Sequence, residues 1–211
     1  MKRFIAVAGN IGVGKSTLVN LLCGQLGWEP FFEGVVDNPY LADFYADMAG
    51  WAFHSQIFFL ARRLRDLRRL MDFPRTVVQD RSVYEDAEIF AKNLYRQGLI
   101  SERDWKCYRE LYEVLTELLP PPDLVVYLQA SVTTLVERIA ARGREYEKGI
   151  APDYLAQLNA LYQEWIGSFT LCPVLTVPAD RLDFVANSDH LELIVEKVQE
   201  KLRGDQLVLF D

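Results

Sequence analysis

The sequence predicts a single α/β domain in which helices cover both faces of a mostly parallel sheet. Short apolar runs alternate with longer helical patterns along the whole chain, and these runs lack the strict alternation of a half-exposed strand. Strands of that kind are typical of a parallel sheet that is buried on both faces. The chain has 211 residues, half of them apolar, which is enough for one sizeable core.

The elements follow one another in the order that a doubly wound fold requires. The expected strands cover residues 3–8, 30–33, 76–79, 124–128 and 174–177. The expected helices cover residues 16–26, 51–71, 85–96, 101–119, 133–142, 154–168 and 191–202. Strand and helix in alternation predict helices on both sides of one sheet. No repeat or shift in composition marks a linker, so we expect one domain over residues 1–211.

Composition restricts the class of partner and the kind of chemistry. A net charge of −7 disfavours a grip on nucleic acid or on an anionic membrane. A strand-like run follows Met1 directly, and no apolar stretch approaches the roughly 18 residues of a membrane span. Three widely spaced cysteines predict neither a disulfide framework nor a zinc site, and with two histidines a general base is expected to be a carboxylate. We therefore expect a cytoplasmic protein that acts on a small molecule.

A phosphate-binding loop connects the first strand to the first helix. Residues 9–16 match the pattern GxxxxGK[ST] in the strand-to-helix context that confirms it. Backbone N–H groups of such a loop surround phosphate oxygens, a lysine neutralises the terminal phosphates, and a hydroxyl can ligate Mg²⁺. The loop consists of Gly9, Asn10, Ile11, Gly12, Val13, Gly14, Lys15 and Ser16. It predicts binding of a nucleoside triphosphate.

Charged residues follow the expected strands at the edge where ligands bind in open α/β sheets. Asp80 ends the third strand and is the expected Mg²⁺ partner, together with Ser16. Arg81 can bridge the transferring phosphoryl group and the attacking hydroxyl. Glu33 ends the second strand and is the expected general base. Glu29 is the competing candidate, but it falls in the turn that enters the strand.

A polar stripe on the long helix predicts a site that reads a nucleobase. Gln56 and Arg63 are seven residues apart and lie on nearly the same helix face. Asp86 and Phe90 share a face of the following helix, so an acid and a ring could meet that stripe. The alternative is that Arg63 belongs to a solvated run of arginines. That run is Arg62, Arg65, Arg68 and Arg69.

A charged, glycine-bounded segment over residues 142–149 is typical of a mobile flap. Arg138, Arg142 and Arg144 are expected to close over the phosphates and exclude water. Glu147 could reach a sugar hydroxyl. The alternative is a salt-bridged helix end. The two interpretations differ in whether these arginines bind a ligand.

Several stretches in order resemble the deoxynucleoside kinase family, most closely its bacterial deoxyadenosine/deoxycytidine kinase branch. They are GNIGVGKST (9–17), DNPYLADFY (37–45), WAFHSQIFFLARR (51–63), QDRSVYEDAEIFAKN (79–93), RIAARGREYEKGI (138–150) and YLAQLNALYQEW (154–165). The resemblance implies a P-loop kinase fold with a five-stranded parallel sheet, a lid over about 138–149, and a homodimer formed through a helical bundle.

The resemblance also implies roles for individual residues. Glu33 would be the catalytic base for the 5′-hydroxyl, assisted by Arg81, and Lys15 of the loop would be catalytic through the phosphates. Tyr45 and Glu147 would hold the 3′-hydroxyl. The implied base contacts are Gln56, Arg63 and Asp86, enclosed by Ile11, Phe44 and Phe90. The implied ATP contacts are the loop through Thr17, the lid residues Arg138, Arg142 and Arg144, and Leu182, Asp183 and Phe184 near the adenine.

Together these features predict transfer of the γ-phosphoryl group of ATP, with Mg²⁺, to the 5′-hydroxyl of a deoxynucleoside. Deoxyadenosine is expected first, and deoxycytidine or deoxyguanosine next. The alternatives are a nucleoside monophosphate kinase of the thymidylate kinase kind, and a P-loop switch or retired kinase that binds nucleotide without transfer. A switch would carry an NKxD motif and a DxxG directly after its metal-side strand, and neither is found there. Assays on deoxynucleosides and their monophosphates distinguish the alternatives.

Overall fold

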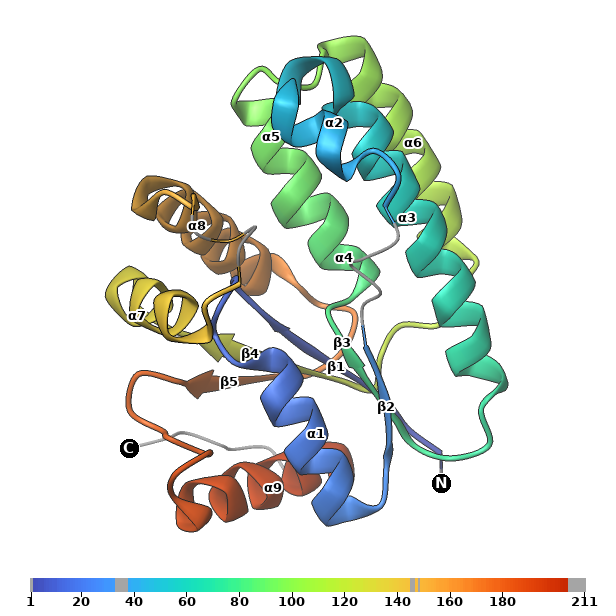
Figure 1. Cartoon of the computed structure of the whole chain (residues 1–211). Coiled ribbons are helices and arrows are strands. Elements are labelled where there is room, and N and C mark those ends of the chain that lie inside the picture. The colour runs from blue at the N-terminus through green and yellow to red at the C-terminus, as the bar shows by residue number, and fades with distance from the viewer. Residues whose placement is uncertain (1, 33–37, 145–146, 148, 205–211) are drawn as a thin grey trace. The chain divides into compact units, whose positions relative to one another are not determined.

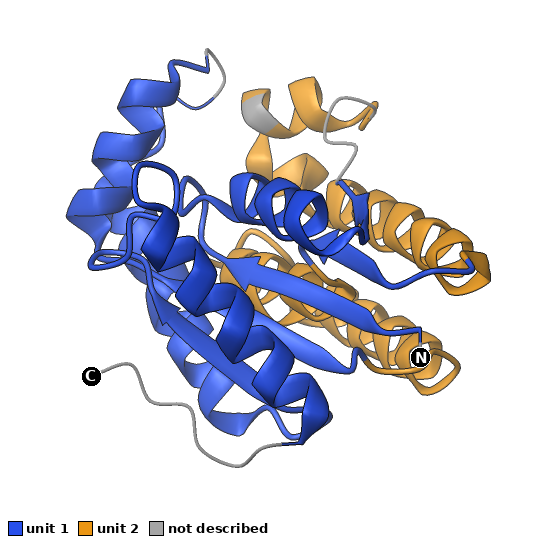
Figure 2. Cartoon of the chain, turned by 90° about the horizontal axis from the view of Figure 1, so that it is seen from below, with its two compact units in different colours: residues 1–32, 74–81, 122–211 blue, residues 33–73, 82–121 orange. Residues whose placement is uncertain are grey.

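The computed structural model describes residues 2–32, 38–144, 147 and 149–204, with the side chain of Tyr45 left aside. These residues form two compact units (Figure 2). Unit 1 comprises residues 1–32, 74–81 and 122–211, and unit 2 comprises residues 33–73 and 82–121. Each unit is described by itself.

Unit 1 holds a parallel sheet whose strand order is β2-β3-β1-β4-β5 (Figure 1). Its central strand β1 pairs in parallel with β3 on one side and with β4 on the other. The outer strands β2 and β5 pair in parallel with β3 and β4. The strands are β1 (Phe4–Gly9), β2 (Glu29–Phe31), β3 (Val77–Asp80), β4 (Leu124–Gln129) and β5 (Val174–Pro178). The predicted five-stranded parallel sheet is therefore confirmed.

In the described part of unit 1, the helices α1 (Lys15–Leu26), α7 (Val132–Arg142), α8 (Pro152–Ser168) and α9 (Ser188–Arg203) flank the sheet. Leu18 of α1 and Ile194 of α9 join Val126 of β4 in one buried core. The next residue of β4, Tyr127, stacks instead on Tyr162 of α8. Because neighbouring residues of a strand point to opposite faces, α8 covers the face opposite α1 and α9 (Figure 1).

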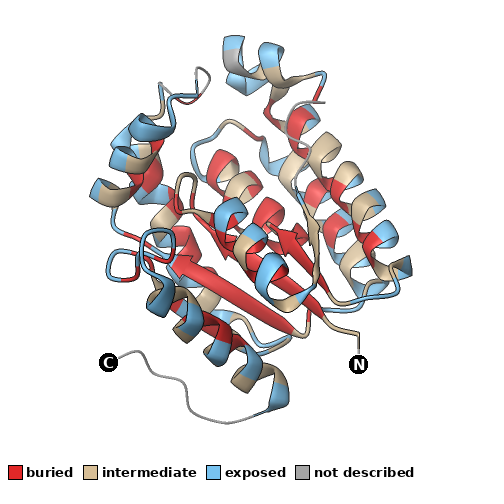
Figure 3. Ribbon diagram, turned by 60° about the horizontal axis from the view of Figure 1, so that its bottom comes forward, coloured by how far each residue is buried: buried red, intermediate tan, exposed pale blue. Residues whose placement is uncertain are grey.

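The central strands are buried on both faces, which explains why their sequences read as continuous apolar runs. Every residue of β1 and β3 is buried, as the red strands of Figure 3 show. The helices around them begin at caps that the sequence supplies. Ser131 accepts a hydrogen bond from the backbone N–H of Thr134 at the start of α7, and Pro152 occupies the first turn of α8.

Unit 2 is helical, and its helices are α2 (Leu41–Ala46), α3 (Met48–Asp72), α4 (Val83–Glu85), α5 (Lys92–Arg96) and α6 (Glu102–Glu117). A π-helical segment, η2 (Asp86–Ala91), joins α4 to α5. The Asp47 carboxylate accepts a hydrogen bond from the Gly50 N–H and starts α3 three residues before the predicted start at Trp51. In the described part of the chain, no helix combines the length and apolarity needed to cross a membrane.

Three local predictions were inaccurate. The second strand was predicted over 30–33 but covers Glu29–Phe31. The helix predicted over 85–96 is divided by the π-helical segment. Residues 41–46 form a helix that was not predicted, because six residues are too few for a hydrophobic period to be read.

Candidate active site

The phosphate loop leaves the carboxyl end of the central strand and leads into α1. Gly9 has a φ of 145°, and a Cβ atom there would lie 2.6 Å from the carbonyl oxygen of Leu128 on the neighbouring strand. Gly12 has a φ of 82°, and its Cβ would lie 2.6 Å from Cγ1 of Ile139. Both positions therefore require glycine for conformation and for space. The backbone can approach a phosphate here because nothing projects from it.

The Lys15 side chain folds back into the phosphate loop. Its side chain is buried, and Nζ donates hydrogen bonds to the carbonyl oxygens of Gly9 at 2.8 Å and Asn10 at 3.0 Å. A lysine ammonium is a compact charge on a flexible stem. Its charge is therefore held within reach of any phosphate that the loop binds.

Ser16 and Asp80 come together although they are 64 residues apart. The Ser16 hydroxyl donates to Oδ2 of Asp80 at 2.5 Å. The sheet explains the contact, because Asp80 ends β3 in register with Val7 of β1, at the edge from which the loop leaves. A hydroxyl and a carboxylate oxygen beside a phosphate loop are the hard ligands that Mg²⁺ prefers.

Arg81 has an unusual backbone conformation. Its φ is 66°, and it is the only non-glycine residue with a positive φ in the described part of the chain. Its N–H donates to the carbonyl oxygen of Val7 at 3.0 Å, which extends the pairing of β3 with β1 by one residue. This conformation costs about 1–3 kcal/mol in proteins and is concentrated at functional sites. The chain therefore holds Arg81 against a local preference, directly after the residue expected to ligate the metal.

A cavity of about 300 Å³ adjoins the loop. Its lining includes Gly14 and Thr17 of the loop region and residues 182–185 of the segment that follows β5. Phe184 is buried, and its ring lies 3.3 Å from the position of a Cβ on Gly14. Leu182, Asp183 and Phe184 therefore lie beside the phosphate loop, and their expected place near the adenine stays a prediction.

Asp183 holds its own segment together. Its carboxylate accepts hydrogen bonds from the backbone N–H groups of Val185 at 3.0 Å and Ala186 at 2.9 Å. These N–H groups hold the pKa of the Asp183 carboxyl below its usual range. Its backbone N–H in turn donates to Nδ1 of His190 at 3.0 Å. The carboxylate thus shapes the turn that carries Phe184.

The arginines expected in the flap occupy two different environments. Arg138 belongs to α7, and its guanidinium donates to the carbonyl oxygens of Val13 and Ala179, each at 2.8 Å. It therefore ties the phosphate loop to the end of β5, which differs from the expected swinging cation. Arg142 donates two-pronged hydrogen bonds to the Glu147 carboxylate, and Arg144 lies 3.6 Å from the same carboxylate. Arg142 also lines the cavity beside the loop.

Glu147 is buried and forms ion pairs with both arginines. It was expected to reach a sugar hydroxyl, but its carboxylate oxygens are occupied by guanidinium groups in this structure. A salt-bridged helix end, the alternative considered for this segment, therefore describes what Arg142 and Arg144 do here. Residues 145, 146 and 148 lie outside the described part of the chain.

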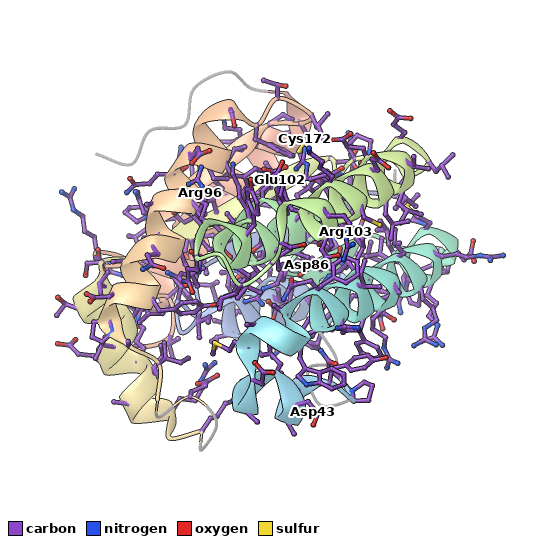
Figure 4. The ribbon with its side chains drawn as sticks, turned by 90° about the horizontal axis from the view of Figure 1, so that it is seen from above. Asp43, Asp86, Arg96, Glu102, Arg103 and Cys172 are labelled. Atoms are coloured by element: carbon purple, nitrogen blue, oxygen red, sulfur yellow. The ribbon has the colours of Figure 1, made fainter. Side chains whose placement is uncertain are left out.

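The polar stripe of unit 2 is buried. Arg63 has 5% of its side chain exposed and forms a bidentate pair with Asp86, with Nε to Oδ2 at 2.9 Å and a second bond at 3.3 Å. The alternative that Arg63 belongs to the solvated arginine run is therefore wrong. Gln56 is also buried, on the same helix as Arg63. Figure 4 labels Asp86 among the helices of unit 2.

Of the remaining residues expected around the nucleoside, the structure describes only some. Phe90 lies with Asp86 in the π-helical segment, and π-helical turns are frequent at functional sites. Phe44 lies on α2 and packs against a small buried cluster that includes Ala52 and Leu94. Glu33 and the side chain of Tyr45 lie outside the described residues.

Sequence reasoning missed the contribution of α8. Asn10, expected only as part of the loop, donates through Nδ2 to the Leu155 carbonyl at 3.0 Å and to Oδ1 of Asn159 at 2.8 Å. Asn159 in turn donates to the Ala130 carbonyl, and the Tyr162 hydroxyl donates to the Gly9 carbonyl at 2.7 Å. The available signal was a polar Asn and Tyr on the otherwise apolar face of that helix.

A phosphate loop at the carboxyl edge of a parallel sheet with this strand order defines a P-loop kinase fold. The family model for deoxynucleoside kinase matches residues 5–203. The chain belongs to the deoxynucleoside kinase family, and it is a phosphotransferase.

Individual relatives agree with this family. The chain is 39% identical over 204 residues to the deoxyadenosine/deoxycytidine kinase of Bacillus subtilis, covering 96% of this chain and 94% of the relative. It is 36% identical to the deoxyguanosine kinase of the same organism, over 93% of this chain and 96% of the relative. A structure of deoxyadenosine kinase from M. mycoides with bound dATP matches with a TM-score of 0.82 and 32% identity, over 93% of this chain and 99% of that one.

The buried pair of Arg63 and Asp86 yields a prediction about stability. Asp86→Ala should lower the free energy of unfolding by about 3–5 kcal/mol, because it leaves a guanidinium buried without its counter-charge. Chemical denaturation measures this change. The matched control is Asp66→Ala on α3, the helix that carries Arg63; its Arg69 partner is 69% exposed and 3.8 Å away. It should cost less than about 1 kcal/mol, and equal losses for the two variants would contradict the prediction.

Proposed function

We propose that the protein transfers the γ-phosphoryl group of ATP to the 5′-hydroxyl of a deoxynucleoside, deoxyadenosine first and deoxycytidine or deoxyguanosine next. The observation that carries this proposal is the buried, bidentate pair of Arg63 with Asp86. A hydrogen-bonding group of this kind is expensive to bury and suits the edge of a nucleobase. It occurs in a chain whose other unit carries a complete phosphate loop.

The donor half of the proposed reaction depends on electrostatics. Lys15 would neutralise the terminal phosphates of ATP, and the loop N–H groups would hold their oxygens. Ser16 and Asp80 fit Mg²⁺, because this ion usually takes one or two carboxylates and keeps phosphate oxygens and waters as its other ligands. When bound, Mg²⁺ would offset charge on the phosphate oxygens.

The acceptor half would use Glu33 as the general base and Arg81 to stabilise the transferring group. The register of β2 supports Glu33 over Glu29. Glu29 is the first residue of β2 and pairs with Val77, the first residue of β3, so it lies at the amino edge of the sheet. It also pairs with Arg75 at 3.1 Å. Glu33 follows the carboxyl end of the same strand, and ligands bind at that edge in open α/β sheets.

Glu33→Gln should therefore lower kcat by about 10²- to 10⁴-fold, because a positioned base contributes about that much. The affinity for ATP should stay at the wild-type value. Steady-state kinetics and a nucleotide titration measure the two quantities. Glu29→Gln is the control and should leave kcat near the wild-type value. A large loss in Glu29→Gln with a normal rate in Glu33→Gln would reassign the base.

Base preference is the second part of the proposal. Gln56, Arg63 and Asp86 together offer both donors and acceptors, so the group can read adenine or cytosine after modest rotation. The relatives include deoxyadenosine/deoxycytidine and deoxyguanosine kinases. In a competition assay with equal concentrations of the deoxynucleosides, deoxyadenosine should be phosphorylated fastest. Faster turnover of deoxynucleoside monophosphates than of any deoxynucleoside would contradict the proposed acceptor.

We also propose a homodimer formed through the helical unit. Leu111 and Val114 of α6 and Leu118, the residue that caps its C-terminus, are exposed by 39%, 58% and 75%. They follow one another at intervals of three and four residues, which places them on one helix face. Exposed apolar rows of this kind mark protein interfaces.

Val114→Glu should convert the dimer to a monomer, because it places a charge in the middle of the apolar row. Light scattering after gel filtration measures the mass. Lys106→Glu, an exposed position of the same helix outside the row, should remain a dimer. A monomeric wild-type protein would contradict the proposed dimer.

A cytosolic location fits the thiol chemistry. Cys23, Cys107 and Cys172 are free, as in proteins of reducing compartments. Burial raises the pKa of the Cys23 and Cys172 thiols to about 11, so both stay protonated and unreactive at neutral pH.

A further inference from the structure

Glu85 is a fully buried acid that no step of the proposed reaction uses. Its Oε2 accepts a hydrogen bond from the backbone N–H of Ser82 at 2.8 Å, and the Ser82 hydroxyl lies 3.4 Å from the same oxygen. Ser82 is the N-cap of α4 and Glu85 is the third residue of that helix, so the two form a capping box. Ser82 is buried as well. The Ser82 N–H is thus held away from water by a carboxylate, which is a strong acceptor.

This hydrogen bond lies directly after Arg81, the residue with the positive φ. The N–H of Ser82 belongs to the peptide group that follows the α-carbon of Arg81. The peptide group that precedes this α-carbon is also held, because the Arg81 N–H donates to the Val7 carbonyl at 3.0 Å. Each of the two hydrogen bonds is formed inside one unit. Val7 and Glu85 therefore hold the peptide groups on the two sides of Arg81.

Both of these peptide groups must turn before Arg81 can leave its left-handed conformation. A right-handed or extended residue differs from a left-handed one in φ and in ψ. Turning the first peptide group breaks the hydrogen bond to Val7, and turning the second breaks the hydrogen bond to Glu85. The strained conformation is thus maintained from one side by the sheet and from the other by a side chain.

We propose that Glu85 is a positioning residue that holds Arg81 in the conformation needed for phosphoryl transfer. The proposal rests on the proposed function, in which the Arg81 guanidinium stabilises the transferring group. The direction in which the Arg81 side chain leaves the backbone depends on the peptide groups beside it. A displacement of a reacting or stabilising group by about 1 Å can cost about 10²-fold in rate. Glu85 would therefore affect the rate through Arg81, without contact to a substrate.

Glu85→Met removes the acceptor and keeps a side chain of similar length. It should lower kcat about 10- to 100-fold, because Arg81 can then leave the strained conformation. The dissociation constant for ATP should stay at the wild-type value, since the phosphate loop is unchanged. The melting temperature should also stay near the wild-type value, because a charge that is no longer buried offsets the lost cap. Steady-state kinetics, a nucleotide titration and a thermal melt measure these quantities.

Glu85→Gln is the matched control, because it keeps an acceptor oxygen at the same length. Glutamine makes the same capping box as glutamate, so this variant should keep kcat near the wild-type value. Equal losses of kcat in Glu85→Gln and Glu85→Met would overturn the proposal, since the hydrogen bond to Ser82 would then not be what matters.

A double-mutant cycle with Arg81→Ala shows whether Glu85 acts through Arg81. In the Arg81→Ala background, Glu85→Met should cause no further loss of kcat, because the positioned group is already absent. Losses that multiply would overturn the proposal, and so would a normal kcat in Glu85→Met beside a slow Arg81→Ala. A normal kcat in Arg81→Ala would overturn the role of Arg81 and this proposal with it. A wild-type protein without ATP-dependent turnover would contradict the proposed function itself.

Hydrogen exchange of the Ser82 amide tests the same point if Glu85→Met does not fold. In the wild-type protein this amide should exchange slowly, because its hydrogen bond is buried and charge-assisted. In Glu85→Gln it should exchange faster than in the wild type, because a neutral acceptor binds the N–H less strongly. Rapid exchange in the wild-type protein, or equal rates in the two proteins, would overturn the proposal.

Discussion

The junction of β1 with the phosphate loop is the constraint on which unit 1 depends. Gly9 has a φ of 145°, which favours glycine. The Leu128 carbonyl oxygen also lies so close to its α-carbon that no side chain would fit. The parallel register then brings Asp80 to the same edge, where it meets Ser16. A central position for β1 is needed for this, because one neighbouring strand supplies the acid and the other limits the turn. The phosphate site is thus a consequence of strand order.

The two units solve different problems of recognition. Phosphate carries charge, so backbone N–H groups and a lysine ammonium suffice to hold it. A nucleobase is neutral and needs fixed donors and acceptors in a dry environment. In the proposed function the buried pair of Arg63 with Asp86 would supply these, at a desolvation cost that only good geometry recovers. The bidentate arrangement of the pair provides that geometry.

The sequence predicted the elements that depend on local pattern. The strands have apolar runs because both their faces are buried, and the phosphate loop has a motif because its glycines have no substitute. The contact of Ser16 with Asp80 could be predicted, since both residues end or follow strands at one edge. The burial of Arg63 could not be decided from spacing, because a helix face looks the same whether water or Asp86 lies opposite. The π-helical segment after Glu85 could not be predicted either, because its sequence has no local pattern that distinguishes it from an α-helix.

The contacts of α8 escaped prediction because they depend on partners about 150 residues away. Asn10 appeared to be a loop residue beside phosphate, yet its amide is occupied by α8, with the acceptor oxygen bound to the N–H of Ile11 at 2.7 Å. Both N–H donors of this amide are occupied, so the side chain has no donor left for a phosphate. Its contribution is therefore to hold the loop in shape. Arg138 of α7 also holds the loop, because its guanidinium donates a hydrogen bond to the Val13 carbonyl. Side chains from α7 and α8 therefore hold the loop through its carbonyls, those of Val13 and Gly9.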